Sequence, residues 1–153
     1  MHQRDRLVGE MPWVIPDVMA VAGRPTPKPL PLAALIPSTL RSQLTYAVAR
    51  IDRSGRMHDQ VITGVAGWRS GDTLSMALTD SYAVFHPDPR GLITVTRSKA
   101  VSIPAVARHQ LMIEVGDRVL LAAHSGHGLI IAYPLATLDR ALADFHSRQS
   151  ATP

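Results

Sequence analysis

Cysteine is absent from this chain of 153 residues. The chain therefore cannot form disulfides or thiolate zinc sites, and it has no cysteine nucleophile. Aromatic residues make up only 5% of it, so a core must consist mainly of valine, leucine, isoleucine and alanine. No apolar run approaches the roughly 18 residues that a membrane helix needs. The first residues also lack the basic-then-apolar order of a signal peptide. We therefore expect a soluble, cytoplasmic protein without a membrane partner.

The basic residues are unevenly distributed along the chain. The chain carries 16 Lys and Arg against 12 Asp and Glu, which gives a formal net charge of +4. Basic character by itself supplies only a non-specific attraction to nucleic acid, so position matters more than the total. Six basic residues fall in two short segments. They are Arg50, Arg53 and Arg56 in the first segment and Arg97, Lys99 and Arg108 in the second.

Residues 1–44 differ in amino-acid composition from the rest of the chain. Seven of the twelve prolines lie between Pro12 and Pro37. Each proline removes a backbone donor and restricts the residue before it, which rules out a regular helix or a central strand. We predict an extended or disordered arm over 1–44. In the alternative interpretation, the arm docks on the domain or on a partner through residues 13–15 and 30–36.

The rest of the chain contains an internal repeat. Gly71-Asp72 matches Gly116-Asp117 at an offset of 45 residues, and Gly55 falls on Lys99 at an offset of 44. Both copies show the same order: strand, tight turn, strand, helical turn, Gly-Asp, strand, turn, strand. We place the first unit at 45–90 and the second unit at 91–134, with one residue gained or lost in the helical turn.

Units this small cannot each bury an apolar face. Domains below about 40 residues usually need disulfides, metals or association, and no cysteine or metal cluster is evident. The two units should therefore share one core, either within the chain as an intrachain pseudo-dimer or between chains in a homo-oligomer. A helix is predicted after them over 135–149, because Leu135, Leu138, Leu142 and Phe145 recur at helical spacing.

The second unit carries a recognisable pattern. The stretch "TRSKAVSIPAVARHQLMIEVGDRVLLAA" resembles the AbrB/MazE/SpoVT family of bacterial DNA-binding domains in Ile103-Pro104, Arg108, Leu111, Ile113 and Gly116-Asp117. The first unit matches the family's turn in "IDRSGRM", with Asp52, Gly55 and Arg56. Each unit also departs from the pattern. Lys99 stands where the family has glycine, and Gln60 and Gly64 stand where it has proline and arginine. The resemblance covers about 48–134.

This resemblance implies a mainly β fold, a swapped-hairpin AbrB-like β-barrel formed by the two tandem units, to which the arm and the C-terminal helix are added. It implies a basic face, made by the first strands and turns of both units, that binds double-stranded DNA. By position, the family's DNA contacts fall on Arg50, Arg56 and Arg108. We add Arg53, Arg97 and Lys99, because their charges lie in the same turns.

The predicted function is that of a DNA-binding transcriptional regulator, cytoplasmic and nucleoid-associated, with no catalysis and no cofactor. The alternative is an antitoxin that holds a toxin protein through its C-terminal region and autoregulates its operon. The segment "HSGHG" (124–128) has two histidines, but we interpret it as a hairpin turn, because a metal site needs more ligands.

Overall fold

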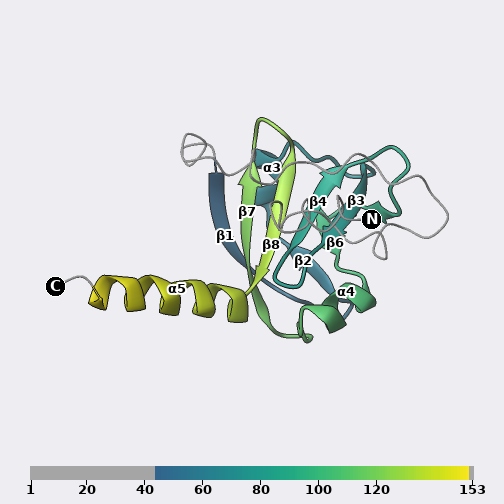
Figure 1. Cartoon of the computed structure of the whole chain (residues 1–153). Helices are drawn as coiled ribbons and strands as arrows, with labels where there is room; N and C mark the ends of the chain where they lie inside the picture. Colours follow the sequence, from purple (N-terminus) through teal and green to yellow (C-terminus); the bar gives the residue numbers. More distant parts are fainter. Residues whose placement is uncertain (1–43, 152–153) are drawn as a thin grey trace, which may run out of the picture.

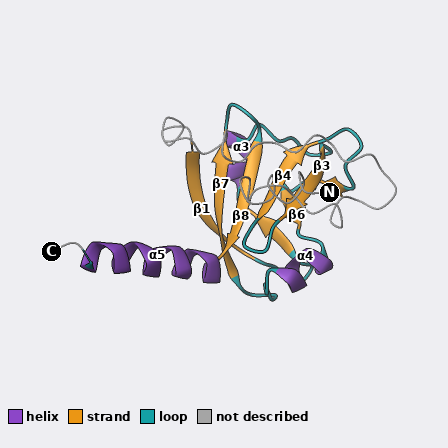
Figure 2. Cartoon of the chain, viewed as in Figure 1, coloured by secondary structure: helices purple, strands orange, loops and turns teal. Residues whose placement is uncertain are grey.

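The fold is known from a computed structural model, which describes residues 44–151 (Figure 1). The predicted arm lies outside the described residues, apart from its last residue, Leu44. Strands dominate the described part, with two short helices and one long one (Figure 2). The elements are β1 (Leu44–Arg50), β2 (Arg56–His58), α3 (Gln60–Val65), β3 (Thr73–Leu78), β4 (Ala83–Pro87), β5 (Ile93–Thr94), β6 (Ala100–Ser102), α4 (Ala105–Gln110), β7 (Arg118–His124), β8 (Leu129–Pro134) and α5 (Leu135–Ser150).

Six strands form one antiparallel sheet in the order β1-β7-β8-β4-β3-β5, and β2 pairs with β6 in a second, two-stranded ladder. The expected mainly β architecture with a C-terminal helix is confirmed. A closed barrel is not present among the described strands, because β1 and β5 are the two edges of the large sheet. The physical reason lies in β2 and β6. Each is only three residues long, and they pair with each other instead of extending the large sheet to closure.

The two units exchange their first strands. β1 of the first unit pairs along seven residues with β7 of the second, from Leu44 opposite His124 to Arg50 opposite Arg118. In the same way, β5 of the second unit pairs with β3 of the first. The β3-β4 and β7-β8 hairpins meet in the middle of the sheet through β4 and β8. Each unit therefore supplies an edge strand to the other, and both lie in one sheet.

One large hydrophobic cluster joins the units. It contains Met57 and Ile62 from the first unit together with Val101 and Ile103 from the second, and all four side chains are buried. Trp68 is the largest side chain in it and is only 2% exposed. Its indole Nε1 donates a hydrogen bond of 2.7 Å to the carbonyl oxygen of Gly128, in the β7-β8 turn. The tryptophan thus connects the first unit to the hairpin of the second through both packing and a hydrogen bond.

The helical turns align differently from the sequence comparison. Asp59 is the N-cap of α3 and Pro104 the N-cap of α4, so the helices are offset by 45 residues. The one-residue difference therefore falls just before each helix. Arg108 corresponds to Thr63, because both backbone N–H groups bond to the N-cap carbonyl of their helix. Pairing Gln60 with the proline and Gly64 with the arginine was therefore wrong.

The turns after the helices also repeat in detail. Gly71 and Gly116 have φ angles of 91° and 93°, a region that favours glycine. The side chains of Asp72 and Asp117 then accept backbone N–H groups three residues earlier, at 2.7 and 2.8 Å. These bonds fix the chain as it enters β3 and β7. The two Gly-Asp pairs matched in the sequence therefore have the same local role in the turn.

The helix α5 leaves the body of the molecule (Figure 1). None of its residues is buried. Among the described residues, its first turn is tied to the body by a 2.6 Å hydrogen bond from the Thr137 hydroxyl to the carbonyl oxygen of Ser81. Within residues 44–151, no helix has both the length and the apolar character to cross a bilayer.

Candidate nucleic-acid interface

The first basic turn joins β1 to β2 and is held by one aspartate. The Asp52 Oδ1 atom accepts the backbone N–H groups of Ser54 at 2.8 Å and Arg56 at 2.9 Å. Gly55 takes the positive φ of 73° that the turn requires. All of these bonds are made by the backbone and by Asp52, so the side chains of Arg53 and Arg56 remain exposed on a fixed turn.

The second basic turn, between β5 and β6, has the same hydrogen-bond pattern as the first, although different residues form it. Thr96 replaces the aspartate, and its Oγ1 accepts the backbone N–H of Ala100 at 2.9 Å. Lys99 replaces the glycine and adopts a φ of 62°. A non-glycine residue in this region costs about 1–2 kcal/mol. The turn is anchored to the first unit, because the Ser70 hydroxyl donates to the carbonyl oxygen of Arg97 at 3.2 Å.

The β2-β6 ladder joins these two turns. Arg56 lies opposite Ser102 and His58 lies opposite Ala100, so the turns flank opposite ends of the ladder. The three paired positions span about 7 Å of strand. Met57 is buried between its neighbours, and therefore Arg56 and His58 both point outward. We call this outer side of the ladder, with residues 52–56 and 96–100, the basic ladder surface.

Arg108 reaches the first turn from α4. Its Nε atom donates a 3.0 Å hydrogen bond to the Ile103 carbonyl oxygen. Its guanidinium covers Gly55 so closely that a Cβ built on that glycine would lie 2.7 Å from the Arg108 Cζ and Nε atoms. The side chain is half-buried, so it combines a structural role with a charge beside the turn. Any side chain at position 55 would displace it.

Arg50 lies at the end of β1, just before the first turn. Its Nε atom donates a 3.0 Å hydrogen bond to the Gly116 carbonyl oxygen. The ladder register places it directly opposite Arg118 of β7, and both side chains are exposed. Like charges opposite each other are unfavourable in a sheet unless an anion lies between or beside them. This pair therefore adds to the positive charge near the first turn.

The structure thus gathers four of the six predicted residues at one end of the ladder, namely Arg50, Arg53, Arg56 and Arg108. It places the other two, Arg97 and Lys99, at the opposite end. Three further candidates were missed: His58, Arg69 and Arg118. Arg118 becomes a candidate only when the β1-β7 register places it opposite Arg50. Arg69 becomes one only when the hydrogen bond from Ser70 places it near the second turn. For His58, the alternation around the apolar Met57 was the available signal.

Lys99 allows a test that separates backbone strain from charge. Lys99→Gly should raise the free energy of unfolding by up to about 1 kcal/mol, because it removes a positive-φ side chain, and it should weaken DNA binding. Met112→Gly is the matched control, since Met112 has a φ of 54° and is 85% exposed but lies outside the basic ladder surface. Urea unfolding and DNA titration of both variants provide the measurement. Equal losses of DNA affinity in the two variants would contradict a role for the Lys99 charge.

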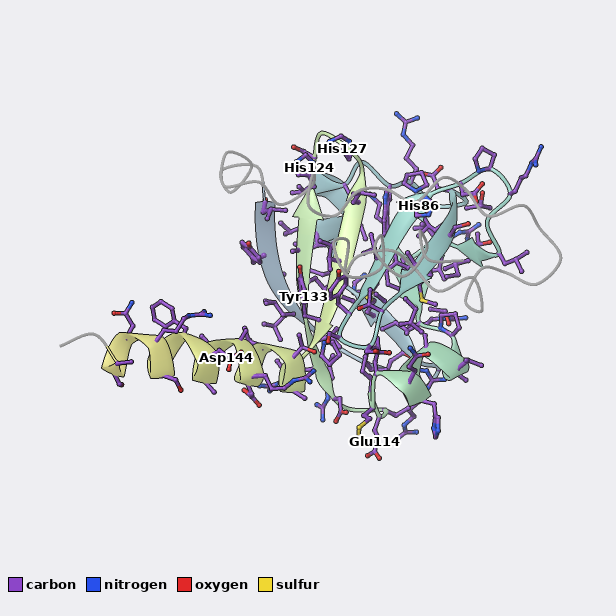
Figure 3. The ribbon with its side chains drawn as sticks, in the orientation of Figure 1. His86, Glu114, His124, His127, Tyr133 and Asp144 are labelled. Carbon is purple, nitrogen blue, oxygen red and sulfur yellow. The ribbon has the colours of Figure 1, made fainter. Side chains whose placement is uncertain are left out.

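The histidines of the 124–128 segment form the end of a hairpin, as expected. Their rings lie 4.8 Å apart, and the backbone N–H of His127 donates to Nδ1 of His124 at 3.2 Å (Figure 3). Burial, with a contribution from His127, lowers the pKa of His124. No group of three His, Cys, Asp or Glu side chains suited to a metal ion occurs in residues 44–151.

Comparison with known proteins adds no relative. No protein-family model, no curated protein and no solved structure matches the chain.

Proposed function

We propose that this chain is a DNA-binding transcriptional regulator of the AbrB/MazE/SpoVT type, in which the two tandem units interleave as swapped hairpins. The exchange of first strands supports this proposal, because β1 pairs with β7 and β5 pairs with β3. From either edge of the large sheet inward, the first strand of one unit is followed by the third and fourth strands of the other unit. An internal two-fold relation of this kind is what a pair of identical subunits would produce.

The basic ladder surface is the observation that carries the proposal. It presents arginine and lysine side chains on two turns that backbone hydrogen bonds hold rigid. Contacts to phosphate position a protein on DNA, and arginine suits them because its fork of donors matches the phosphate oxygens. A rigid turn also limits the conformational entropy lost when the side chain binds. The acid in the first turn, Asp52, accepts two backbone N–H groups through Oδ1 and so helps to hold the turn.

The two turns are alike in backbone and different in sequence. Gly55-Arg56 at one end of the ladder is replaced by Lys99-Ala100 at the other. The protein should therefore prefer a pseudo-symmetric site in double-stranded DNA, with two half-sites of similar but unequal sequence.

Selection from a randomised duplex library tests the proposal. The full chain is immobilised, and the retained duplexes are sequenced after several rounds. We expect a shared pseudo-symmetric sequence and an affinity that falls with salt, by about 0.9 log units per log unit of salt for each phosphate engaged. Failure to retain any duplex at low salt would overturn DNA binding. Retention without sequence enrichment would overturn sequence-specific regulation.

An antitoxin remains the second candidate function, and one observation favours it. The helix α5 projects from the body, and Leu142 and Phe145 are each about half exposed. Such a helix is suited to hold another protein. Its charges are mixed, with Asp139 and Asp144 beside Arg140 and Arg148, so it lacks a strongly acidic face for a basic toxin.

A further inference from the structure

The exposed apolar stripe of α5 needs a partner. Leu135, Leu142 and Phe145 are 37%, 47% and 49% exposed, and no residue of the helix is buried. A helix of 16 residues is marginal in water without packing against another element. The described part of the chain supplies packing only at the first turn, through the bond from Thr137 to Ser81.

We propose that α5 pairs antiparallel with α5 of a second copy of this chain, about a two-fold axis near Leu142. In an antiparallel pair, positions equally far from the centre face each other. Leu142 then packs against its own counterpart, and Leu138 lies near Phe145 of the second copy. The stripe is thus complementary to itself, which is the condition for a closed two-fold dimer.

Two polar side chains beside the stripe, which can form a hydrogen bond with each other, fit the same register. Asp139 and His146 are seven residues apart, so they lie on one flank of the helix. With the axis at Leu142, Asp139 lies three positions and His146 four positions from the centre, so Asp139 of one copy lies near His146 of the other twice over, just as Leu138 lies near Phe145. Both residues are exposed in the single chain. Asp144 and Arg140 lie away from the stripe and face solvent (Asp144 in Figure 3).

The shape of the molecule permits this pairing. α5 is directed away from the body on the side of the edge strand β1, so most of its length lies away from the sheet and is open to a second helix (Figure 1). β1 itself exposes Tyr46 and Val48, each 56% exposed. Four apolar side chains from each copy bury less than the roughly 1,200 Å² of a stable complex. The dimer should therefore be weak and dependent on concentration.

Sedimentation velocity of the full chain tests the pairing at concentrations from about 1 to about 200 µM, where weak interfaces associate. We expect the mass to rise from 16.6 kDa towards twice that value. Leu142→Glu should remain at 16.6 kDa throughout, since it places two charges at the axis. Ala143→Glu, which adds the same charge on the same helix outside the stripe, should associate like the unaltered chain.

A charge exchange tests the register. Asp139→Lys should weaken the dimer at least threefold, and adding His146→Glu in the same chain should restore it. Circular dichroism shows whether α5 is retained in each variant. A wild-type chain that stays at 16.6 kDa at every concentration would overturn the proposal and leave α5 for the N-terminal arm or for a different protein. Equal association of Leu142→Glu and Ala143→Glu would also overturn it, because the dimer would then use another surface.

Discussion

Replacing Arg53 and Arg56 together by alanine should weaken binding of the full chain to duplex DNA about 30-fold. Each exposed cation near a phosphate contributes about 1 kcal/mol, and about 1.4 kcal/mol corresponds to a tenfold change in affinity. The slope of log affinity against log salt should shrink by about 1.8, since two phosphates lose their partners. Both side chains are exposed, and the turn is held by backbone groups that alanine keeps. Fluorescence anisotropy over a series of salt concentrations gives both quantities.

The matched control for this experiment removes the same charge from elsewhere. Arg140→Ala with Arg148→Ala also takes away two cations, but these lie on α5, which projects from the body (Figure 1). Their loss should leave the salt slope within experimental error, because only cations at the interface release counterions. If both double variants lost the same affinity, the attraction would depend on net charge alone and the site assignment would be wrong.

Trp68→Ala should destabilise the whole molecule by about 3–5 kcal/mol, the usual cost of removing a buried large aromatic side chain. Domains of this size are stable by only about 5–15 kcal/mol, so the variant would lose a large fraction of the free energy of unfolding. The expected loss is large because Trp68 is 2% exposed and binds Gly128 of the other unit at 2.7 Å. Urea unfolding followed by far-ultraviolet circular dichroism measures it, and both units should unfold in one transition.

Trp68→Phe separates packing from the hydrogen bond. Phenylalanine keeps an aromatic ring in the core but cannot donate to Gly128, and an unsatisfied buried acceptor costs about 1–3 kcal/mol. The loss should therefore be smaller than for Trp68→Ala. A loss below about 1 kcal/mol for Trp68→Ala, or two separate unfolding transitions in the unaltered chain, would contradict a core shared by both units.

Local signals in the sequence were sufficient for the local elements. The turn at 52–56 was predicted from Asp52 and Gly55, and the helix at 135–149 from its apolar spacing; the structure has Leu135–Ser150. The helical turn before the Gly-Asp pair of each unit was also expected, and α3 and α4 confirm it. In each case the decisive residues lie within a few positions of one another, so their interactions can be inferred without knowing the tertiary structure.

Long-range pairing could not be predicted in the same way. Nothing in the sequence places Arg50 opposite Arg118, because the register of β1 against β7 depends on the whole sheet. The one-residue difference between the units was misplaced, because Asp59 and Pro104 differ chemically although both begin a helix. The prediction of a closed barrel was wrong for a related reason. The strands β2 and β6 are short because α3 and α4 begin soon after them.

The most direct measurement is a titration of the ¹⁵N-labelled full chain with duplex DNA, followed by amide chemical shifts. If the basic ladder surface binds DNA, the largest changes should fall on residues 53–56 and 97–99, at both ends of the β2-β6 ladder. The amides of α5 should remain unchanged. An absence of shifts in the two turns, or shifts confined to α5, would contradict the proposed DNA interface.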